Sequence, residues 1–93
     1  MAHFAKIQDT KVVDIIVVNN DDCGGGEFPE SEPIGQAFIA SCNIDGDWQQ
    51  CSYNNNFRNC YPGISYIFDP LLGEYGEFYL PPQPEPIVPD IEP

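Results

Sequence analysis

The sequence predicts a small α+β domain, in which one short helix covers an antiparallel β-sheet of four to five strands. Two β-branched runs near the N-terminus flank a short polar turn, which is typical of a hairpin. One later segment carries apolar residues at helical spacing, and further aromatic runs are separated by turn-forming residues. A chain of 93 residues favours a single domain, which we expect at residues 1–80, followed by an extended Pro-rich arm at residues 81–93.

The first expected element is the N-terminal hairpin. His3–Ile7 alternates loosely between apolar and polar residues, and Val12–Val18 is rich in β-branched residues. Gln8–Lys11 between them is polar and suits a turn. The second strand is apolar on both faces except for Asp14, so we expect it either to lie centrally in the sheet or to be covered on both sides.

Residues 19–32 predict an acidic loop without regular structure, because they combine three consecutive glycines with asparagines and a dense set of acids. Whether this loop binds a hard cation such as Ca²⁺ is open at this point, since carboxylates are suitable ligands. The candidate ligands are Asp21, Asp22, Glu27, Glu30 and Glu32. A solvated surface loop explains the same residues without a ligand. The glycines lack the spacing and the lysine of a phosphate-binding loop.

Pro33–Cys42 is the one helix candidate. Proline suits the first helical turn, where its missing N–H would have no partner. Four apolar residues recur at helical spacing and form one stripe: Ile34, Ala37, Phe38 and Cys42. We expect this stripe to lie across the sheet, with Phe38 as its main anchor. Gly35 weakens the helix by up to about 1 kcal/mol relative to alanine, so tertiary packing must hold it.

The middle of the chain, residues 47–69, holds the only Trp, the only Arg and two of the four cysteines. Asn54–Asn56 predicts a turn, because asparagine tolerates positive φ. The runs on either side, Trp48–Tyr53 and Phe57–Tyr61, predict the two strands of a hairpin. We expect its aromatic residues to pack the domain.

The four cysteines allow two interpretations. A turn centred on the last two asparagines places Cys51 opposite Cys60, where a disulfide can form only at a close-approach pair. Cys23 and Cys42 would then be the remaining pair. Buried free thiols are the competing interpretation, because no secretory signal precedes the domain and the chain is expected to be made in a reducing compartment. No CxxC pair is present, so we expect no zinc site.

The end of the chain predicts a second hairpin and then the arm. Ile64–Asp69 and Gly76–Leu80 are the strand candidates. Residues 81–93 hold six prolines and no glycine, which predicts an extended, largely polyproline-II segment. We expect this arm to bind a neighbouring subunit, although a solvated acidic tail has the same composition. The residues assigned to the arm contact are Pro81, Pro82, Pro84, Pro86, Ile87, Val88, Pro89 and Ile91.

Composition argues against several classes of function. Three Lys and Arg face fifteen Asp and Glu, which gives a net charge of −12. This charge disfavours nucleic acid and anionic membranes, and favours a partner with a basic or neutral face. No apolar run approaches the roughly 20 residues of a membrane span. The one histidine, His3, forms no recognisable pattern with a nucleophile, so we expect no catalysis, metal or cofactor.

Several stretches together form a signature: MAHFAKI and IIVVNN, then DWxQxSYNxNFRxxY and PGIxY. They occupy Met1–Ile7, Ile15–Asn20, Asp47–Tyr53, Asn56–Arg58, Tyr61 and Gly63–Tyr66. With the Pro-rich end, this signature resembles a family of small proteins of tailed bacteriophages, especially phages of cyanobacteria and other aquatic bacteria. The SYNxNFR core is its specific part, and Cys51 and Cys60 depart from the usual pattern. The resemblance implies a virion-associated structural protein and no catalytic residue.

Three functions compete at this point. The first is a capsid decoration or cement protein, which binds the major capsid protein at a symmetry axis and bridges neighbouring subunits with its arm. The second is a component of the tail or tail-fibre apparatus, with tail proteins as partners. The third is a small acidic phage protein that binds and inhibits a host protein. The first two predict a protein that is made in the host cytoplasm and then resides in the virion, as a homo-oligomer or within a symmetric assembly.

Overall fold

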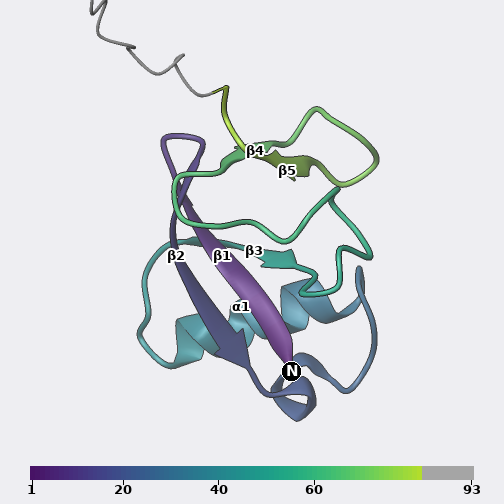
Figure 1. The fold of residues 1–93 in the computed structure, drawn as a ribbon. Coiled ribbons are helices and arrows are strands. Elements are labelled where there is room, and N and C mark those ends of the chain that lie inside the picture. The colour runs from purple at the N-terminus through teal and green to yellow at the C-terminus, as the bar shows by residue number, and fades with distance from the viewer. Residues whose placement is uncertain (83–93) are drawn as a thin grey trace, which may run out of the picture.

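The computed structural model describes residues 1–82, and it confirms the predicted α+β class. Five antiparallel strands form one curled sheet in the order β3-β1-β2-β4-β5, and a helix lies against it (Figure 1). The strands are β1 (Ala2–Gln8), β2 (Lys11–Val18), β3 (Asp47–Cys51), β4 (Ile67–Asp69) and β5 (Glu77–Tyr79). The helices are the 3₁₀ turn η1 (Asn20–Cys23) and the α-helix α1 (Ser31–Ser41).

The predicted Pro-rich arm falls almost entirely beyond the described part of the chain. Pro81 and Pro82 are described, and they follow β5 at the end of the molecule opposite the N-terminus (Figure 1). The remaining arm residues lie outside the described residues: Pro84, Pro86, Ile87, Val88, Pro89 and Ile91. The arm and its boundary at residue 80 therefore stay predictions.

The predicted N-terminal hairpin is confirmed as β1 and β2. Its turn has Asp9 at φ 53° and Thr10 at φ 66°, the two positive values that a tight hairpin turn with right-handed twist requires. The register shifts by one residue after Lys6, so that Ile7 pairs with Val12 and Val13 has no partner on β1. This bulge bends and twists the hairpin, which helps the sheet to curl.

The sheet order places β2 at the centre, as one of the two alternatives predicted, but the strand covered on both faces is β1. β1 lies between β3 and β2, and its side chains alternate between two apolar cores. Phe4 points into the core under α1, and Ala5 points into the core under β4 and β5. β2 pairs with β4 only at Lys11, and Val17 near the other end of β2 is 50% exposed.

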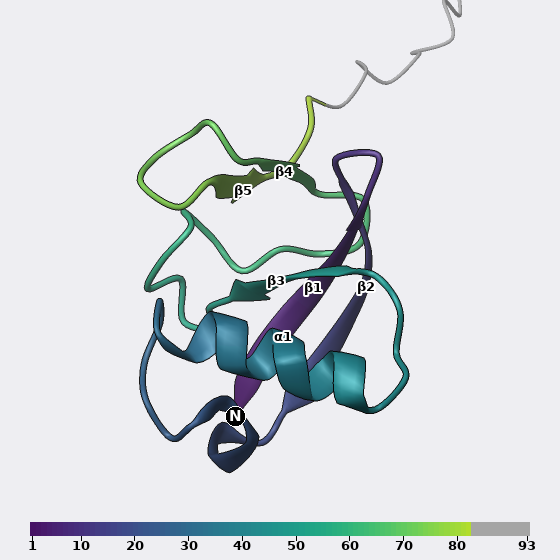
Figure 2. The same cartoon turned by 180° about the vertical axis from the view of Figure 1, so that it is seen from behind.

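The helix prediction is confirmed, with α1 lying across β1, β2 and β3 (Figure 2). The predicted stripe is wrong, because Ile34 is 46% exposed, Ala37 and Cys42 are exposed and Phe38 is only half-buried. The buried stripe is instead Ser31, Gly35 and Ile39. A Cβ at Gly35 would stand 2.3 Å from Cζ of Phe4, so this glycine lets the helix approach β1 closely.

The hairpin predicted around Asn54–Asn56 is wrong. β3 pairs with β1, with Ala5 opposite Gln49, and residues 52–66 contain no strand. Positive φ values at Arg58 (57°) and Asn59 (75°) stop this segment from extending as a strand. The loop instead crosses between β3 and the β4–β5 pair (Figure 1).

The acidic loop and the second hairpin are close to the prediction, and they differ from it in the turn η1 and in the bounds of α1 and of the strands. Residues 20–23 form the turn η1, because the Asn19 side chain accepts a hydrogen bond from the Asp21 amide (3.3 Å) and Cys23 is buried. α1 begins at Ser31, inside the segment that was expected to be irregular. β4 and β5 pair antiparallel and confirm the second hairpin, with shorter strands than predicted.

Candidate functional site

The most heavily bonded side chain of the described residues is Arg58, which is 8% exposed. Its Nε donates to the carbonyl of Tyr75 (3.1 Å), and Nη1 donates to the carbonyl of Gln50 (2.8 Å) and to Glu32 Oε2. Nη2 donates to Glu32 Oε1 (3.2 Å) and to Gln49 Oε1 (3.2 Å). All five N–H donors of the guanidinium thus have an acceptor, as a buried arginine requires.

Aromatic rings surround this guanidinium. Its Cζ lies 4.9 Å from the ring centroid of Phe28 and 5.2 Å from that of Phe68, distances at which cation–π attraction operates. Phe28 stacks on Phe57 (3.9 Å between centroids) and meets the edge of Tyr75 (4.9 Å). The side chains of Arg58 and Glu32 are 5% and 17% exposed, so the electrostatic attraction of this largely buried ion pair is stronger than that of an exposed pair.

The same cluster covers the outer edge of β3, which has no neighbouring strand. The Gln50 amide donates to Glu32 Oε2 (2.8 Å), and the Gln50 carbonyl accepts from Arg58. Gln36 Nε2 donates to the Trp48 carbonyl (2.6 Å). Ser31 Oγ donates to the Gln50 side chain (2.7 Å), which fixes that side chain below the helix. Side chains therefore satisfy backbone groups that would otherwise be open to a foreign strand.

Arg58 and Asn59, which we call the Arg58 segment, also cover the opposite edge of the sheet. The Phe78 amide in β5 donates to the Arg58 carbonyl (3.1 Å), and Asn59 Nδ2 donates to the Phe78 carbonyl (2.9 Å). The sheet curls so that its two edge strands, β3 and β5, both meet this short segment. Arg58 thereby joins the first and last strands of the sheet order, and helps to enclose the core that holds Phe68 and Phe78.

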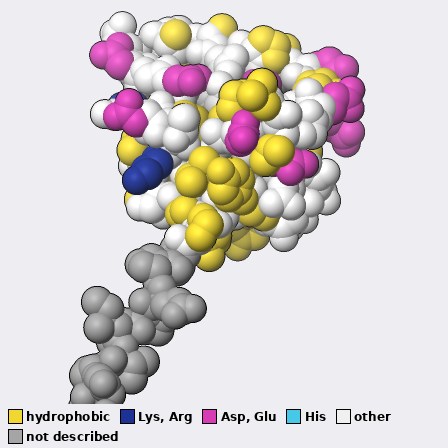
Figure 3. Space-filling model, turned by 90° about the horizontal axis from the view of Figure 1, so that it is seen from above, with side chains coloured by type: hydrophobic (Ala, Val, Ile, Leu, Met, Phe, Trp, Pro, Cys, Tyr) yellow, Lys and Arg dark blue, Asp and Glu magenta, His cyan; other side chains and the backbone are white. Residues whose placement is uncertain are grey.

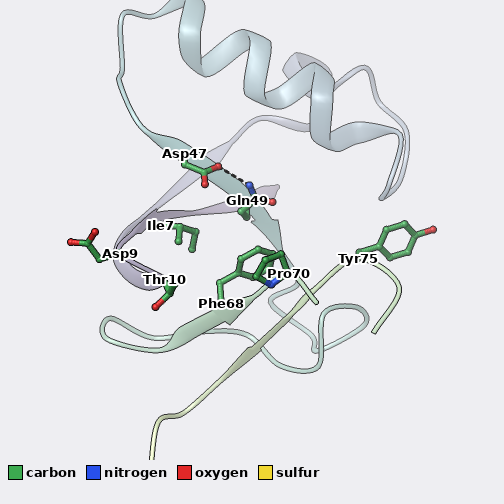
Figure 4. Close-up of a pocket in the computed structure, with 8 residues that line it drawn as sticks. All are labelled: Ile7, Asp9, Thr10, Asp47, Gln49, Phe68, Pro70 and Tyr75. Carbon is green, nitrogen blue, oxygen red and sulfur yellow. Dashed lines mark hydrogen bonds between the residues drawn. The ribbon is translucent and has the colours of Figure 1, made fainter. Parts of the chain in front are cut away.

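A pocket of about 380 Å³ lies directly beside this cluster. Gln49 connects the two, because its Oε1 accepts from Arg58 Nη2 and its Nε2 donates to Asp47 Oδ1 (2.7 Å). Figure 4 shows Asp47 on one side of the pocket and Tyr75 on the other. The lining residues are Ile7, Asp9, Thr10, Asp47, Gln49, Phe68, Pro70 and Tyr75.

The lining of this pocket is apolar with an acidic side. Ile7, Phe68 and Pro70 supply hydrocarbon surface, and Asp9 and Asp47 supply two carboxylates. No Lys, Arg or His is among the lining residues, and the Asp9 carboxylate has no hydrogen bond or ion pair within residues 1–82. Such a lining can bind a group that has both hydrocarbon and a positive charge.

The pKa shifts describe burial and give no sign of an activated group. Burial raises the pKa of the Cys51 thiol to about 12, and burial also raises the pKa of Tyr61. Burial and the N-terminal amine lower the pKa of His3, which stacks on Tyr53 (5.4 Å between ring centroids). A thiol with a raised pKa is a weak nucleophile at neutral pH.

The structure separates the residues that the sequence had grouped. All four cysteines are free thiols: Cys51 and Cys60 border the core under β4 and β5, Cys23 lies under α1, and Cys42 is exposed. No three His, Cys, Asp or Glu side chains among residues 1–82 come together as metal ligands. Of the acids proposed for a cation, Glu32 binds Arg58 instead.

The role of Arg58 and the pocket were not predicted from the sequence. The one usable signal was a single arginine, in a chain with fifteen acids, placed within an aromatic stretch. Buried arginines need a carboxylate partner, so this composition could have suggested an internal ion pair. The partner Glu32 is 26 residues away, and nothing in the pattern singles it out.

Comparison of the chain with protein-family models, with curated proteins and with solved structures finds no match. Among residues 1–82, no helix is long and apolar enough to cross a membrane. The functional proposal therefore depends on the surface that this chain presents and on its sequence signature.

Proposed function

We propose that this protein is a non-enzymatic structural protein of a tailed bacteriophage, a capsid decoration protein that binds the major capsid protein. The observation that carries the proposal is an exposed apolar surface over β4 and β5, at the root of the predicted arm. Leu71 is 90% exposed and Leu80 is 56% exposed, and Leu72 and Tyr75 are exposed beside them in sequence. Exposed apolar side chains that gather on one face are typical of a surface that a partner covers.

The surroundings of this apolar surface fit a protein interface. Hydrophobic side chains gather in the middle of the face and reach the point where the described chain ends, with carboxylates beside them on the part of the face away from that end and a basic side chain at the margin (Figure 3). An apolar centre with a polar rim is the usual arrangement of a protein–protein interface. The net charge of −12 favours a partner surface that is basic or neutral.

The edges of the sheet favour binding through this face. The edge strands β3 and β5 are covered by the Arg58 segment. The part of β2 that β4 leaves unpaired is protected against the addition of a strand in another way. There the bulge at Val13 interrupts the strand, and Asp14 Oδ1 accepts from the Ile15 amide (2.8 Å). Bulges and charged side chains at an edge both hinder the addition of a foreign strand. The apolar face over β4 and β5 is consequently the better docking surface.

Purified virions test the proposal directly. Mass spectrometry of intact particles should detect this chain, and its copy number should match that of the capsid lattice, hundreds per particle. A copy number of tens or fewer would assign the chain to the tail, and absence from the particle would overturn a structural role and favour the host-protein inhibitor.

Substitution at the apolar face tests the surface itself. Leu71→Ser should weaken binding to undecorated capsids about tenfold, as removal of a central interface side chain commonly does, without changing the unfolding midpoint. Ile44→Ser removes a comparably apolar, exposed residue on the helix side of the sheet and should leave binding unchanged. Equal binding by both variants would show that the partner does not use the face over β4 and β5.

A further inference from the structure

The pocket beside the Arg58 cluster has the chemistry of a site for a basic side chain. Figure 4 shows Ile7 and Phe68 in the middle, Asp47 beside them on β3, Tyr75 at one end, and Asp9 at the other end on the hairpin turn with its carboxylate directed outward. The pocket volume of about 380 Å³ is at the lower end of the range of small-ligand pockets, roughly 300–1,000 Å³. One long side chain therefore fits it.

Lysine and arginine match both parts of this lining. Their hydrocarbon stems pack on apolar surface while the charged head stays at a polar edge. Ile7 and Phe68 offer that surface, and the Asp47 carboxylate offers an acceptor for the head, with the charge of Asp9 at the rim. An uncharged apolar side chain would leave the charge of both carboxylates unbalanced, and an acidic one would be repelled by them.

The Asp47 side chain is already oriented by hydrogen bonds within the protein. Its Oδ1 accepts from Gln49 Nε2, and Gln49 Oε1 is bound by the buried Arg58. The side chain of Gln49 is therefore fixed at both ends, so the Asp47 carboxylate is oriented before any partner arrives. Preorganisation of this kind lowers the entropy cost of binding.

The occupant must come from another protein. Residues 83–93 contain three acids and no Lys or Arg, so charge repulsion opposes their entry into an acidic pocket. The chain has only three cations, and Arg58 is buried in its own ion pair. A second copy of the chain could offer only Lys6 or Lys11, and would bring another net charge of −12 with it.

We propose that this pocket binds a lysine or arginine side chain of the partner protein, with its head at Asp47, its stem on Ile7 and Phe68, and Asp9 adding negative charge at the rim. The inference rests on the proposed function, since it supplies the chemistry by which the capsid protein is recognised. The apolar face over β4 and β5 then gives binding area, and the pocket gives selectivity for a partner with a protruding basic residue.

Binding to undecorated capsids gives the first test. The double variant Asp9→Asn with Asp47→Asn keeps the shape of both side chains, and should weaken binding about fivefold, as expected for the loss of exposed charge pairs. The salt dependence of binding should decrease with it. The matched control, Asp21→Asn with Asp22→Asn, removes the same charge from η1 and should bind like the wild type. Equal weakening of binding in both double variants would overturn the proposal that the pocket binds a basic side chain.

A small probe tests the pocket without any capsid. N-acetyl-arginine amide should cause saturable NMR shifts of the Thr10 amide and the Gln49 side-chain amide, and these shifts should vanish in the Asp9→Asn, Asp47→Asn variant. N-acetyl-norleucine amide, which lacks the charge, should not reproduce them. Equal shifts from both probes, or persistence in the variant, would refute recognition of a basic group.

The proposed phage structural role and the proposed basic-side-chain site can fail independently of each other. Absence of the chain from virions together with binding of the arginine probe would remove the phage structural role and keep the basic-side-chain site. Presence in virions together with an inactive probe and unaffected binding of the pocket variant would keep the structural role and remove the site. Concentration-dependent self-association that is lost in a Lys11→Gln variant would make a second copy the occupant, and would overturn the proposed capsid contact.

Discussion

The two faces of β1 are held against their neighbours in different ways. On the helix side, Phe4 packs against Gly35 and Ile39 in an apolar core. On the other side, Ala5 and Phe78 lie in a core whose cover is largely a loop without strands. That loop is fixed by the hydrogen bonds and the ion pair of Arg58.

This difference shows how a small domain can enclose a second core with few regular elements. A helix satisfies its own backbone hydrogen bonds, so it can cover a sheet mainly by apolar packing, with a few side-chain hydrogen bonds to β3 added here. A loop has backbone groups that need partners, and here one arginine supplies donors to three carbonyl or amide oxygens as well as a carboxylate. The second face should therefore depend on a single residue, and the first on the fit between two surfaces.

The largest expected effect on stability comes from removing Arg58, which fixes the loop over the second core. Arg58→Ala leaves Glu32 partly buried without its cation and removes the donors to the Gln50 and Tyr75 carbonyls. Removal of one partner of a buried ion pair costs about 3–5 kcal/mol, so we expect that loss in the free energy of unfolding, measured by urea titration. Such a loss approaches the whole stability of a domain of this size.

Two controls sharpen this prediction. Lys11→Ala removes an exposed cation and should change the free energy of unfolding by less than about 0.5 kcal/mol. The double variant Arg58→Met with Glu32→Gln removes both charges, and should be more stable than Arg58→Ala, because no uncompensated carboxylate remains. If Arg58→Ala is as stable as Lys11→Ala, the ion pair does not hold the second face.

A smaller effect is expected from the packed side. Gly35→Ala adds a methyl group that would stand 2.3 Å from Cζ of Phe4 and 2.9 Å from Sγ of Cys23. Although alanine favours helices, this overpacking should destabilise the domain by about 1–3 kcal/mol, measured as a lower urea midpoint. Gly26→Ala has open space around the added methyl group and should be neutral or slightly stabilising. A more stable Gly35→Ala would show that the helix does not rest on Phe4.

The contrast between the two faces also explains which predictions from the sequence succeeded. The hairpin of β1 and β2 and the helix α1 are local elements, and their periodicity and turn residues predict them. The predicted buried stripe of the helix was wrong, because it followed the large apolar residues. The contact with β1 is made at a glycine, where close approach matters more than hydrophobicity.

The second face could not be predicted from local pattern. Trp48–Tyr53 and Phe57–Tyr61 have the composition of paired strands, but β3 pairs with β1 across more than forty residues of sequence. The Arg58–Glu32 pair, and the pocket that Gln49 connects to it, depend on contacts of the same long range. Composition showed that the one arginine was unusual, and only the fold shows which acid it binds.

The smallest effect is a pH dependence of the second core, which contains the buried thiol of Cys51. Burial raises the pKa of this thiol from 9.0 in the unfolded chain to about 12, so the folded state holds the proton more tightly. Stability is therefore full below pH 9 and falls as the pH rises from 9 towards 12, because the unfolded chain loses the proton first. Between pH 8 and pH 10 the wild type should lose about 1.4 kcal/mol more than Cys51→Ala, measured by urea unfolding. Cys42→Ala, which removes an exposed thiol at the end of α1, should retain the wild-type loss, and identical pH curves for wild type and Cys51→Ala would place Cys51 in contact with solvent.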